Sequence, residues 1–197
     1  METKRRGRPR SFDRDAALDR ATMAFWEHGY ETTSIADLTD AMGIGAPSLY
    51  AAFGDKKALF AEVVESYAVR YGSFGARALA EEPTARAGLA RLLSETAAEF
   101  TDPSHPRGCL MICAAANCAT PEVDEALRER RNANIASFES RLRADMAVGE
   151  LPPDTDPAAL ARFVGAVIQG MSQQARDGAT AAELRNVAET AMRAWPA

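Results

Sequence analysis

The sequence predicts an all-α protein with an N-terminal domain of short helices and a C-terminal domain of longer ones. Apolar residues recur at helical spacing in one segment after another, and runs of β-branched residues are scarce. Proline and glycine fall between these segments, where helices begin and end. The chain has 197 residues, 47% of them hydrophobic and 26% charged, so it has an ordinary globular composition and is long enough to bury a core.

The first helix is predicted from Asp13 to His28. Its buried stripe consists of Ala17, Leu18, Ala21, Ala24 and Phe25. Gly29 follows directly and ends the helix. His28 lies at the helix C-terminus, where the dipole favours a positive charge, so we interpret it as a cap and not as a chemical group.

A second helix is predicted from Ser34 to Met42. Ser34 and Asp37, three residues apart, form the capping-box pattern that marks a helix start. The apolar face of this helix consists of Ile35, Leu38 and Met42. Gly43 ends the helix, and the chain turns within residues 43–45.

The third helix begins at Ala46-Pro47, because proline is tolerated in the first helical turn. Its only large apolar pair, Leu49 and Phe53, faces the core. The outward residues are small: Ala46, Pro47, Ser48, Ala51 and Ala52. A short helix without long side chains can enter the DNA major groove, which makes this unit a helix-turn-helix. The alternative is a helical hairpin that only packs.

Residues in this stretch also agree with a known pattern in order and spacing: Thr32, Thr33, Met42, Gly43, Ile44, Leu49, Tyr50, Phe53, Lys56, Leu59 and Phe60. The pattern resembles the DNA-binding domain of TetR/AcrR-type transcription regulators and covers roughly the first third of the chain. The resemblance implies phosphate contacts by Thr33, Tyr50 and Lys56. The residues that we expect to enter the major groove are those of 45–51, including Gly45, Ala46, Pro47 and Ser48. The chain departs from the family pattern at Gly45, Pro47 and Ala52.

Residues 1–12 are predicted to be a basic arm. They carry five basic side chains and one acidic one, a net charge of +4, whereas the rest of the chain carries −9. Arg6-Gly7-Arg8-Pro9 reproduces the core of an AT-hook, in which arginine enters a narrow A·T minor groove. We therefore expect Arg6, Arg8 and Arg10 to bind double-stranded DNA beside the helix-turn-helix. The alternative is a solubilising tail or a cloning remnant.

We divide the chain into the arm (1–12), a helix-turn-helix DNA-binding domain (13–56) and a ligand-binding and dimerisation domain (57–197). The remaining predicted helices run from Lys56 to Leu79, Thr84 to Thr101, Arg107 to Cys118, Pro121 to Val148, Asp156 to Arg176 and Ala181 to Trp195. Gly72 and Gly75 predict a kink in the first of these. The segment 107–118 is almost wholly apolar, so we expect it to be buried.

The last two helices are predicted to form a homodimer. The 156–176 helix carries one apolar stripe, and Phe163, Ala166 and Gly170 mark a second face, so both of its sides can be covered. Paired terminal helices are also what the family resemblance implies. The alternative is a larger monomeric core.

The resemblance implies a small-molecule effector in the C-terminal domain. Polar residues within apolar stripes are candidate contacts, because a buried polar group must find a partner. They are Thr96, Asn117, Arg131 and Asn134, with Phe100, Cys113 and Phe138 as candidate walls. Backbone groups or water can satisfy each polar group instead. We expect no cofactor.

Cys109 and Cys113 lie four residues apart, on one face of their predicted helix. Such a pair can sense redox state, which makes a thiol-based transcription factor our alternative function, or can ligate a soft metal with His105. A full zinc site needs more ligands than these, and unpaired cysteines are commonly buried by packing alone. We therefore predict no metal site.

The sequence contains no catalytic motif that we can identify. With only two histidines it has no HExxH pair, and it lacks a P-loop, a dinucleotide fingerprint and a G-x-S-x-G turn. The few cysteines and the lack of an apolar signal segment indicate the cytoplasm, and the apolar runs are too short to span a membrane. We therefore predict a ligand-responsive DNA-binding regulator and favour a homodimeric repressor released from a near-palindromic operator by its effector.

Overall fold

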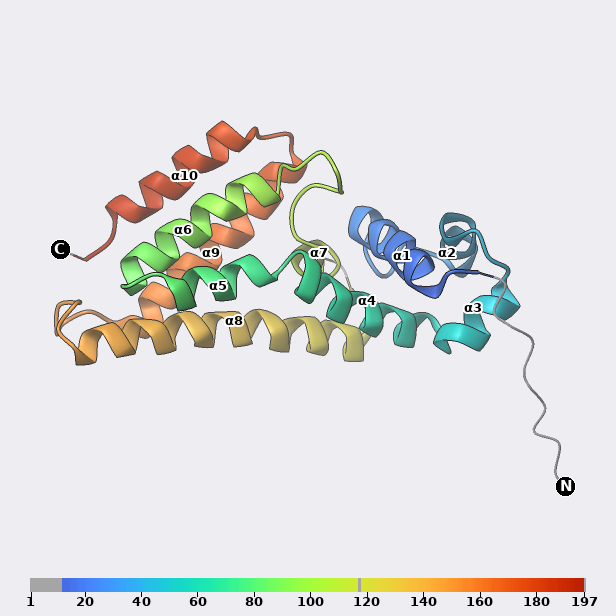
Figure 1. Cartoon of the computed structure of the whole chain (residues 1–197), viewed down its shortest axis with the longest axis horizontal. Coiled ribbons are helices and arrows are strands. Elements are labelled where there is room, and N and C mark those ends of the chain that lie inside the picture. The colour runs from blue at the N-terminus through green and yellow to red at the C-terminus, as the bar shows by residue number, and fades with distance from the viewer. Residues whose placement is uncertain (1–11, 117, 197) are drawn as a thin grey trace, which may run out of the picture.

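The computed structural model describes residues 12–116 and 118–196, and every regular element within them is a helix. Helices α1 to α10 span Arg14–His28, Ile35–Met42, Ala46–Phe53, Lys56–Arg70, Ser73–Glu81, Ala85–Glu99, Leu110–Cys113, Pro121–Ala147, Pro157–Arg176 and Ala181–Arg193. The predicted all-α class is confirmed. Helices α1 to α3 form a small head at one end of the molecule, and α5, α6, α8, α9 and α10 form a larger body (Figure 1). None of the described helices is long and apolar enough to cross a bilayer.

The helix-turn-helix of the head begins and ends at residues that the sequence marks locally. Ser34 and Asp37 form the reciprocal capping box of α2, and Gly43 ends that helix in the left-handed conformation with φ 67°. Pro47 occupies the first turn of α3. The predicted motif is therefore confirmed.

The helix predicted from Lys56 to Leu79 is in fact two helices, α4 and α5, separated at Tyr71 and Gly72. Gly72 lies so close to the preceding turn that a Cβ there would come within 3.0 Å of the Ala68 carbonyl oxygen. Glycine permits this approach and also weakens the helix, so the chain breaks where we expected only a kink. After the break, α5 packs against α6.

The helix predicted over residues 107–118 is also shorter than expected. Only α7, a single turn, is helical, because Gly108 just before it has φ +81° and the chain continues as turns at 114–116. Ile112 and Cys113 are only half-buried. The predicted helix is therefore too long, and its expected burial holds for Leu110, Met111 and Ala114 but not for Ile112 and Cys113.

Helix α8 extends from the far end of the body to beneath α4 (Figure 1), so it contacts two hydrophobic cores. The first core joins the head to α4, α7 and the start of α8, where Val123 and Leu127 are buried. The second core fills the body and includes Phe138 and Leu142. Cys109 packs against both cores. A displacement of α8 would therefore change the packing of both cores.

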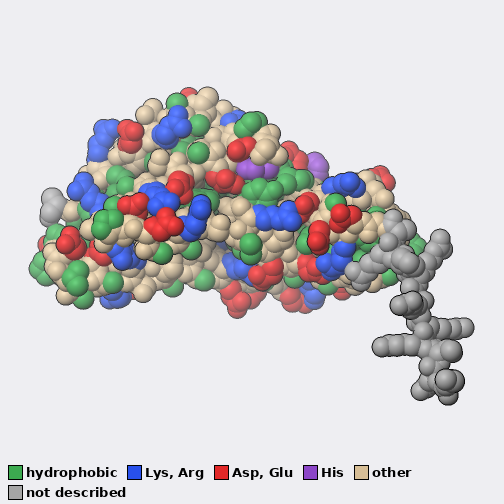
Figure 2. Space-filling view, viewed as in Figure 1, with side chains coloured by type: hydrophobic (Ala, Val, Ile, Leu, Met, Phe, Trp, Pro, Cys, Tyr) green, Lys and Arg blue, Asp and Glu red, His purple; other side chains and the backbone are tan. Residues whose placement is uncertain are grey.

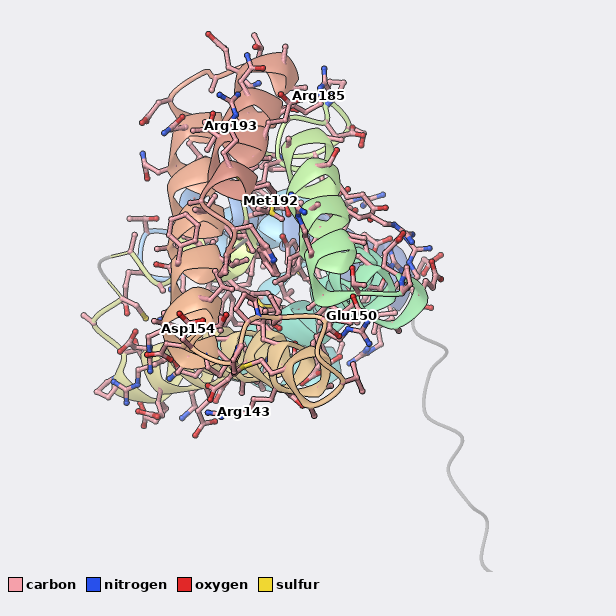
Figure 3. All side chains as sticks on the ribbon, turned by 90° about the vertical axis from the view of Figure 1, so that its left-hand side faces the viewer. Arg143, Glu150, Asp154, Arg185, Met192 and Arg193 are labelled. Atoms are coloured by element: carbon pink, nitrogen blue, oxygen red, sulfur yellow. The ribbon has the colours of Figure 1, made fainter. Side chains whose placement is uncertain are left out.

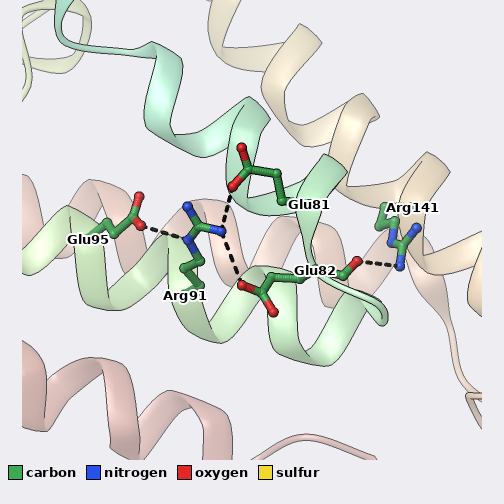
Figure 4. Close-up of polar contacts among 5 residues, drawn as sticks. All are labelled: Glu81, Glu82, Arg91, Glu95 and Arg141. Atoms are coloured by element: carbon green, nitrogen blue, oxygen red, sulfur yellow. Dashed lines mark hydrogen bonds and ion pairs between the residues drawn. The ribbon is translucent and has the colours of Figure 1, made fainter.

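A cluster of charged side chains holds the C-terminal end of α5 (Figure 4). Arg91 of α6 donates to the carboxylates of Glu81, Glu82 and Glu95, at 2.9, 3.1 and 2.7 Å. These hydrogen bonds, that of Glu95 above all, raise the pKa of Arg91 above its ordinary value. Arg141 of α8 donates to the Glu82 carbonyl oxygen at 3.2 Å. The cluster therefore attaches α5 to both α6 and α8.

Candidate DNA interface and ligand cavity

The outer face of α3 is the candidate DNA-reading surface. Leu49 and Phe53 are 0% and 4% exposed and hold the inner face against the head. The large outward side chain of α3 is Tyr50, which is 50% exposed. No acidic side chain lies on this helix, so none on it would repel a phosphate. The other predicted groove residues are also at the surface, Gly45 and Pro47 exposed and Ala46 and Ser48 half-exposed.

The three residues predicted to contact phosphates differ in how they are presented. Tyr50 projects from the head. Thr33 is buried and its hydroxyl donates to the Gly29 carbonyl at 2.6 Å, so it can donate to a phosphate only after that bond breaks. The Lys56 ammonium lies 4.3 Å from the centroid of the Tyr30 ring, and desolvation lowers the pKa of Lys56. Thr33 and Lys56 are therefore engaged within the head.

The predicted arm residues Arg6, Arg8 and Arg10 lie outside the described residues. The chain that follows the arm is fixed by Arg14, the first residue of α1. Its guanidinium donates to both carboxylate oxygens of Glu62 at 2.7 Å and to the Ala52 carbonyl at 3.3 Å. It also lies 4.3 Å from the centroid of the Phe53 ring. The start of α1 is thereby tied to the end of α3 and to α4.

The charges of the body are mixed. Acidic and basic side chains are interleaved over the face formed by α5 and α8 (Figure 2). This face therefore lacks the uniformly basic patch that marks a nucleic-acid surface, and the arm remains the strongest concentration of positive charge in the sequence.

The head is joined to the body by contacts that sequence reasoning missed. The main one is Trp26 of α1, which is fully buried and donates its indole N–H to the Gly108 carbonyl at 3.2 Å. Its ring stacks on His105 with a centroid distance of 4.3 Å. The rings of Tyr67 and Tyr71 meet it edge-on, at 4.8 and 5.0 Å. Helix α1 is therefore inserted between α4 and the α6–α7 loop.

Two charged side chains add contacts at helix ends. Glu31 accepts hydrogen bonds from the backbone N–H groups of Ala119 and Thr120, at 2.9 and 2.8 Å, at the N-terminus of α8. Arg176 of α9 donates to the Glu27 carbonyl at 3.2 Å, at the C-terminus of α1. Each side chain has the charge that the helix dipole favours at that end. The head is thus attached to α8 and α9 as well.

Replacing Glu31 by glutamine is expected to flatten the acid side of the stability–pH profile. Hydrogen bonds from Thr120 and then Ala119 lower the pKa of Glu31 below its ordinary value of 4.5. A carboxyl with a lowered folded-state pKa stabilises the protein above its unfolded pKa, and this stabilisation is lost as pH falls through the folded value. Thermal unfolding from about pH 3 to pH 7 measures the difference.

The matched control is Glu150→Gln, which changes an exposed carboxylate at the far end of the body (Figure 3). Its acid limb should match that of the unaltered protein. The idea fails if Glu31→Gln and Glu150→Gln give the same profile.

A cavity of about 350 Å³ lies between the end of α4 and helices α5, α6, α8 and α9, and it opens to solvent where Ala133, Asn134 and Ser137 are exposed. Its apolar walls are Tyr67, Tyr71, Phe74, Leu79, Leu92, Phe100, Met111, Phe138 and Ile168. A smaller cavity of about 80 Å³ shares Cys109, Met111, Asn134, Phe138 and Ile168 with it. Volume and lining are typical of a small-molecule site.

The predicted effector residues fall in different places. Those that line the larger cavity are Thr96, Phe100, Asn134 and Phe138. Arg131 lines the smaller one, and its guanidinium donates to a backbone carbonyl of α7 at 3.1 Å. Cys113 lines neither cavity, and Asn117 lies outside the described residues. Thr96 donates its hydroxyl to the Leu92 carbonyl at 2.8 Å, so this side chain is satisfied by the backbone.

Larger hollows lie on the outside of the body. One of about 620 Å³ is lined by α6 and α10, which pack against each other, and Arg185, Met192 and Arg193 of α10 contribute to it (Figure 3). Another of about 620 Å³ lies where the α8–α9 loop, at Asp154, meets α9. The 350 Å³ cavity also opens to solvent along α8, but more helices converge on it and aromatic rings form much of its lining. We therefore consider the 350 Å³ cavity the candidate ligand site.

The cysteines are free thiols. Burial raises the pKa of the Cys109 thiol, whereas a reactive cysteine is one whose thiolate is favoured. The Cys113 sulfur lies 3.8 Å from the Ser172 hydroxyl oxygen. Within residues 12–116 and 118–196, no three His, Cys, Asp or Glu side chains are grouped closely enough to hold a metal ion.

Comparison with known proteins finds relatives along the whole chain. The family model for bacterial regulatory proteins of the tetR family matches residues 17–63, and that for the tetracyclin repressor-like C-terminal domain matches residues 85–195. The HTH-type transcriptional repressor ComR of Escherichia coli K12 is 41% identical over 98% of this chain and 93% of ComR. BdcR, an HTH-type transcriptional repressor of the same organism, is 28% identical over 87% of this chain and 83% of BdcR.

Solved structures of TetR-family regulators also match this chain. A cysteine mutant of the TetR family transcriptional regulator CifR, complexed with 26-bp double-strand operator DNA, is 46% identical with a TM-score of 0.93, over 96% of this chain and 100% of that one. A TetR transcriptional regulator from Chloroflexus aurantiacus J-10-FL, 22% identical, shares the fold with a TM-score of 0.79 over 91% of each chain.

Proposed function

Because the chain belongs to the TetR family of transcriptional regulators, we propose that it is a cytoplasmic, homodimeric repressor that leaves a near-palindromic operator when a small effector binds its body. The observation that carries this proposal is the outer face of α3, held by Leu49 and Phe53 and presenting Tyr50 among small residues. Such a face can enter a major groove. The complex of the related regulator CifR with operator DNA supports DNA binding by this chain.

We propose that α9 and α10 form the dimer interface. Phe163 is 40% exposed, and together with Val167 and Val187 it lines an apolar hollow of about 540 Å³ between these helices. A second copy related by two-fold symmetry would cover this surface and present two heads to one duplex. Heads about 34–36 Å apart would read the two halves of a near-palindrome.

We propose that the effector acts through α4, which reaches from the cavity to the head. Tyr67 and Tyr71, at the C-terminal end of this helix, line the cavity, and Lys56, at its other end, lies close behind α3. An effector that binds one position of α4 more tightly than another shifts the protein toward that position. Release from DNA then follows from a changed spacing of the two heads.

The test is binding of the purified protein to fluorescent duplexes selected from random DNA, followed by fluorescence anisotropy with the selected operator. Tyr50→Phe keeps the ring and removes the hydroxyl that would donate to a phosphate. We expect the operator affinity to fall about tenfold or more, because hydrogen bonds to charged groups contribute about 1.5–3 kcal/mol.

Val148→Ala is the control, since this exposed side chain follows α8 at the end of the body remote from the head. It should bind the operator like the unaltered protein. Selection that yields no preferred sequence would refute the proposed function, and unchanged affinity of Tyr50→Phe would refute the role of Tyr50.

A further inference from the structure

We propose that the effector is a ring-bearing organic monoanion, an aromatic carboxylate in the simplest case, and that Arg130, Asn134 and Ser137 of α8 bind its charged group. This inference rests on the proposed effector site and names the class of molecule that the site takes. Its basis is the charge of the cavity lining, the arrangement of polar groups along α8 and the aromatic character of the other walls.

The cavity lining contains no acid. Among the described residues, no aspartate or glutamate lines either the larger or the smaller cavity. The charged side chains of the lining are Arg130 in the larger cavity and Arg131 in the smaller one. A bound cation would lie beside the Arg130 guanidinium and be repelled by it, and the acid that contacts this arginine, Glu65, lies outside the lining and is already paired with it. The lining therefore selects against cations.

Three donors line up on one face of α8. Arg130, Asn134 and Ser137 are four and three residues apart, a spacing that places them above one another on a helix, and all three line the larger cavity. Guanidinium, amide and hydroxyl groups can each donate a hydrogen bond. The Ser137 hydroxyl donates to the Asn134 backbone carbonyl at 3.1 Å and can turn toward a ligand instead. This row of donors is suited to a carboxylate or a sulfonate.

Arg130 can exchange its present partner for a ligand. It forms an ion pair with Glu65 of α4, and the two side chains are 34% and 67% exposed. Exposed pairs contribute little to stability, so a carboxylate within the cavity can compete for the guanidinium. The exchange would also remove a contact between α4 and α8. Binding of an anion would then loosen α4, the helix that connects the cavity to the head.

The other walls favour a ring system. Five of the lining side chains are aromatic: Tyr67, Tyr71, Phe74, Phe100 and Phe138. Aromatic rings pack favourably against other rings, face to face with an offset or edge to face. A volume of about 350 Å³ is near the lower end for small-molecule sites and accommodates a fused two-ring molecule.

The test compares two molecules with the same rings and opposite charge, naphthalene-2-carboxylate and 2-naphthylmethylammonium. Their binding to the full-length protein is measured by isothermal titration calorimetry. We expect the carboxylate to bind about tenfold more tightly or better, because its charge-assisted hydrogen bonds have no counterpart for the ammonium. Arg130→Gln should abolish this preference. Arg128→Gln, an exposed arginine of the same helix outside the lining, should retain it.

A second variant locates the site. Ala133→Trp fills the cavity from a solvent-exposed position on its rim, so it should abolish carboxylate binding without disturbing the core. Ala136→Trp, at an exposed position of α8 outside the lining, is the control. Carboxylate binding that survives Ala133→Trp overturns the proposal, as does equal or tighter binding of the ammonium. A carboxylate that does not bind at all overturns it too.

Operator affinity of the same proteins, measured without either probe, keeps the two proposals apart. If the protein binds its operator but shows no preference for the carboxylate, the proposal of an anionic effector is rejected and the regulatory function is not. Failure of the unaltered protein to bind any operator rejects the regulatory function itself.

Discussion

Replacing Trp26 by alanine is expected to lower the free energy of unfolding by about 3–5 kcal/mol. The indole is fully buried between the head and the body, so its removal leaves a cavity and deprives the Gly108 carbonyl of its donor. Urea unfolding at a fixed protein concentration measures the change. Circular dichroism is the appropriate probe, because the chain has only two tryptophans and the substitution removes one fluorescent reporter.

Trp26→Phe separates the ring from its hydrogen bond. Phenylalanine keeps an aromatic ring among His105, Tyr67 and Tyr71 but cannot donate to Gly108, so we expect a smaller loss, of which the bond accounts for about 0.5–1.5 kcal/mol. Equal stability of the alanine and phenylalanine variants would mean that the buried ring does not join head and body.

Removing residues 1–10 is expected to lower operator affinity by roughly a hundredfold at moderate salt and to flatten its salt dependence. The deleted segment carries five basic side chains and one acidic side chain. Each basic group that displaces a counterion from DNA contributes about 0.9 to the slope of log affinity against log salt concentration. Fluorescence anisotropy titrations over a range of salt concentrations give both quantities.

The control keeps the positive charge of the arm but replaces its planar guanidinium groups by ammonium groups. With Arg6, Arg8 and Arg10 replaced by lysine, the salt slope should stay near that of the unaltered protein. The preference for A·T flanks should weaken, since arginine is the side chain that best exploits a narrow minor groove. A truncated protein with an unchanged slope would show that the arm does not contact DNA.

The parts of the fold that were predictable are those specified by neighbouring residues. Three such features are the capping box of Ser34 and Asp37, the turn at Gly43 and the proline start of α3. Each depends only on residues a few positions away, so the sequence pattern was sufficient to predict it. The break at Gly72 was not predictable in full. Glycine indicates a weak point, but only the packed structure shows that α5 leaves α4 for α6.

The contacts between head and body were missed because their partners are far apart in the sequence. Trp26 and Gly108 are 82 residues apart, Glu31 and Ala119 are 88, and Arg176 and Glu27 are 149. No local pattern connects such pairs. Trp26 itself could have been found, since it follows Phe25 and widens the apolar stripe of α1.

The cavity was predictable only in part. The sequence indicated Asn134 as a polar residue within an apolar stripe and Phe100 and Phe138 as candidate cavity walls. All three line the 350 Å³ cavity. Arg130 was overlooked because an arginine on a long, polar helix suggests an exposed face. Its place in the cavity lining follows from the packing of α8 beside α4, where it pairs with Glu65, a residue 65 positions away in the sequence.

The attachment of Arg14 has a consequence for the layout of the operator. Since this side chain ties the first turn of α1 to Glu62, Phe53 and Ala52, the chain enters the head at a fixed corner beside α3. We therefore expect the A·T-rich flank to lie at one constant offset, in base pairs, from the centre of each half-site. Sites in which that offset differs by even a few base pairs should be bound no better than sites without the flank.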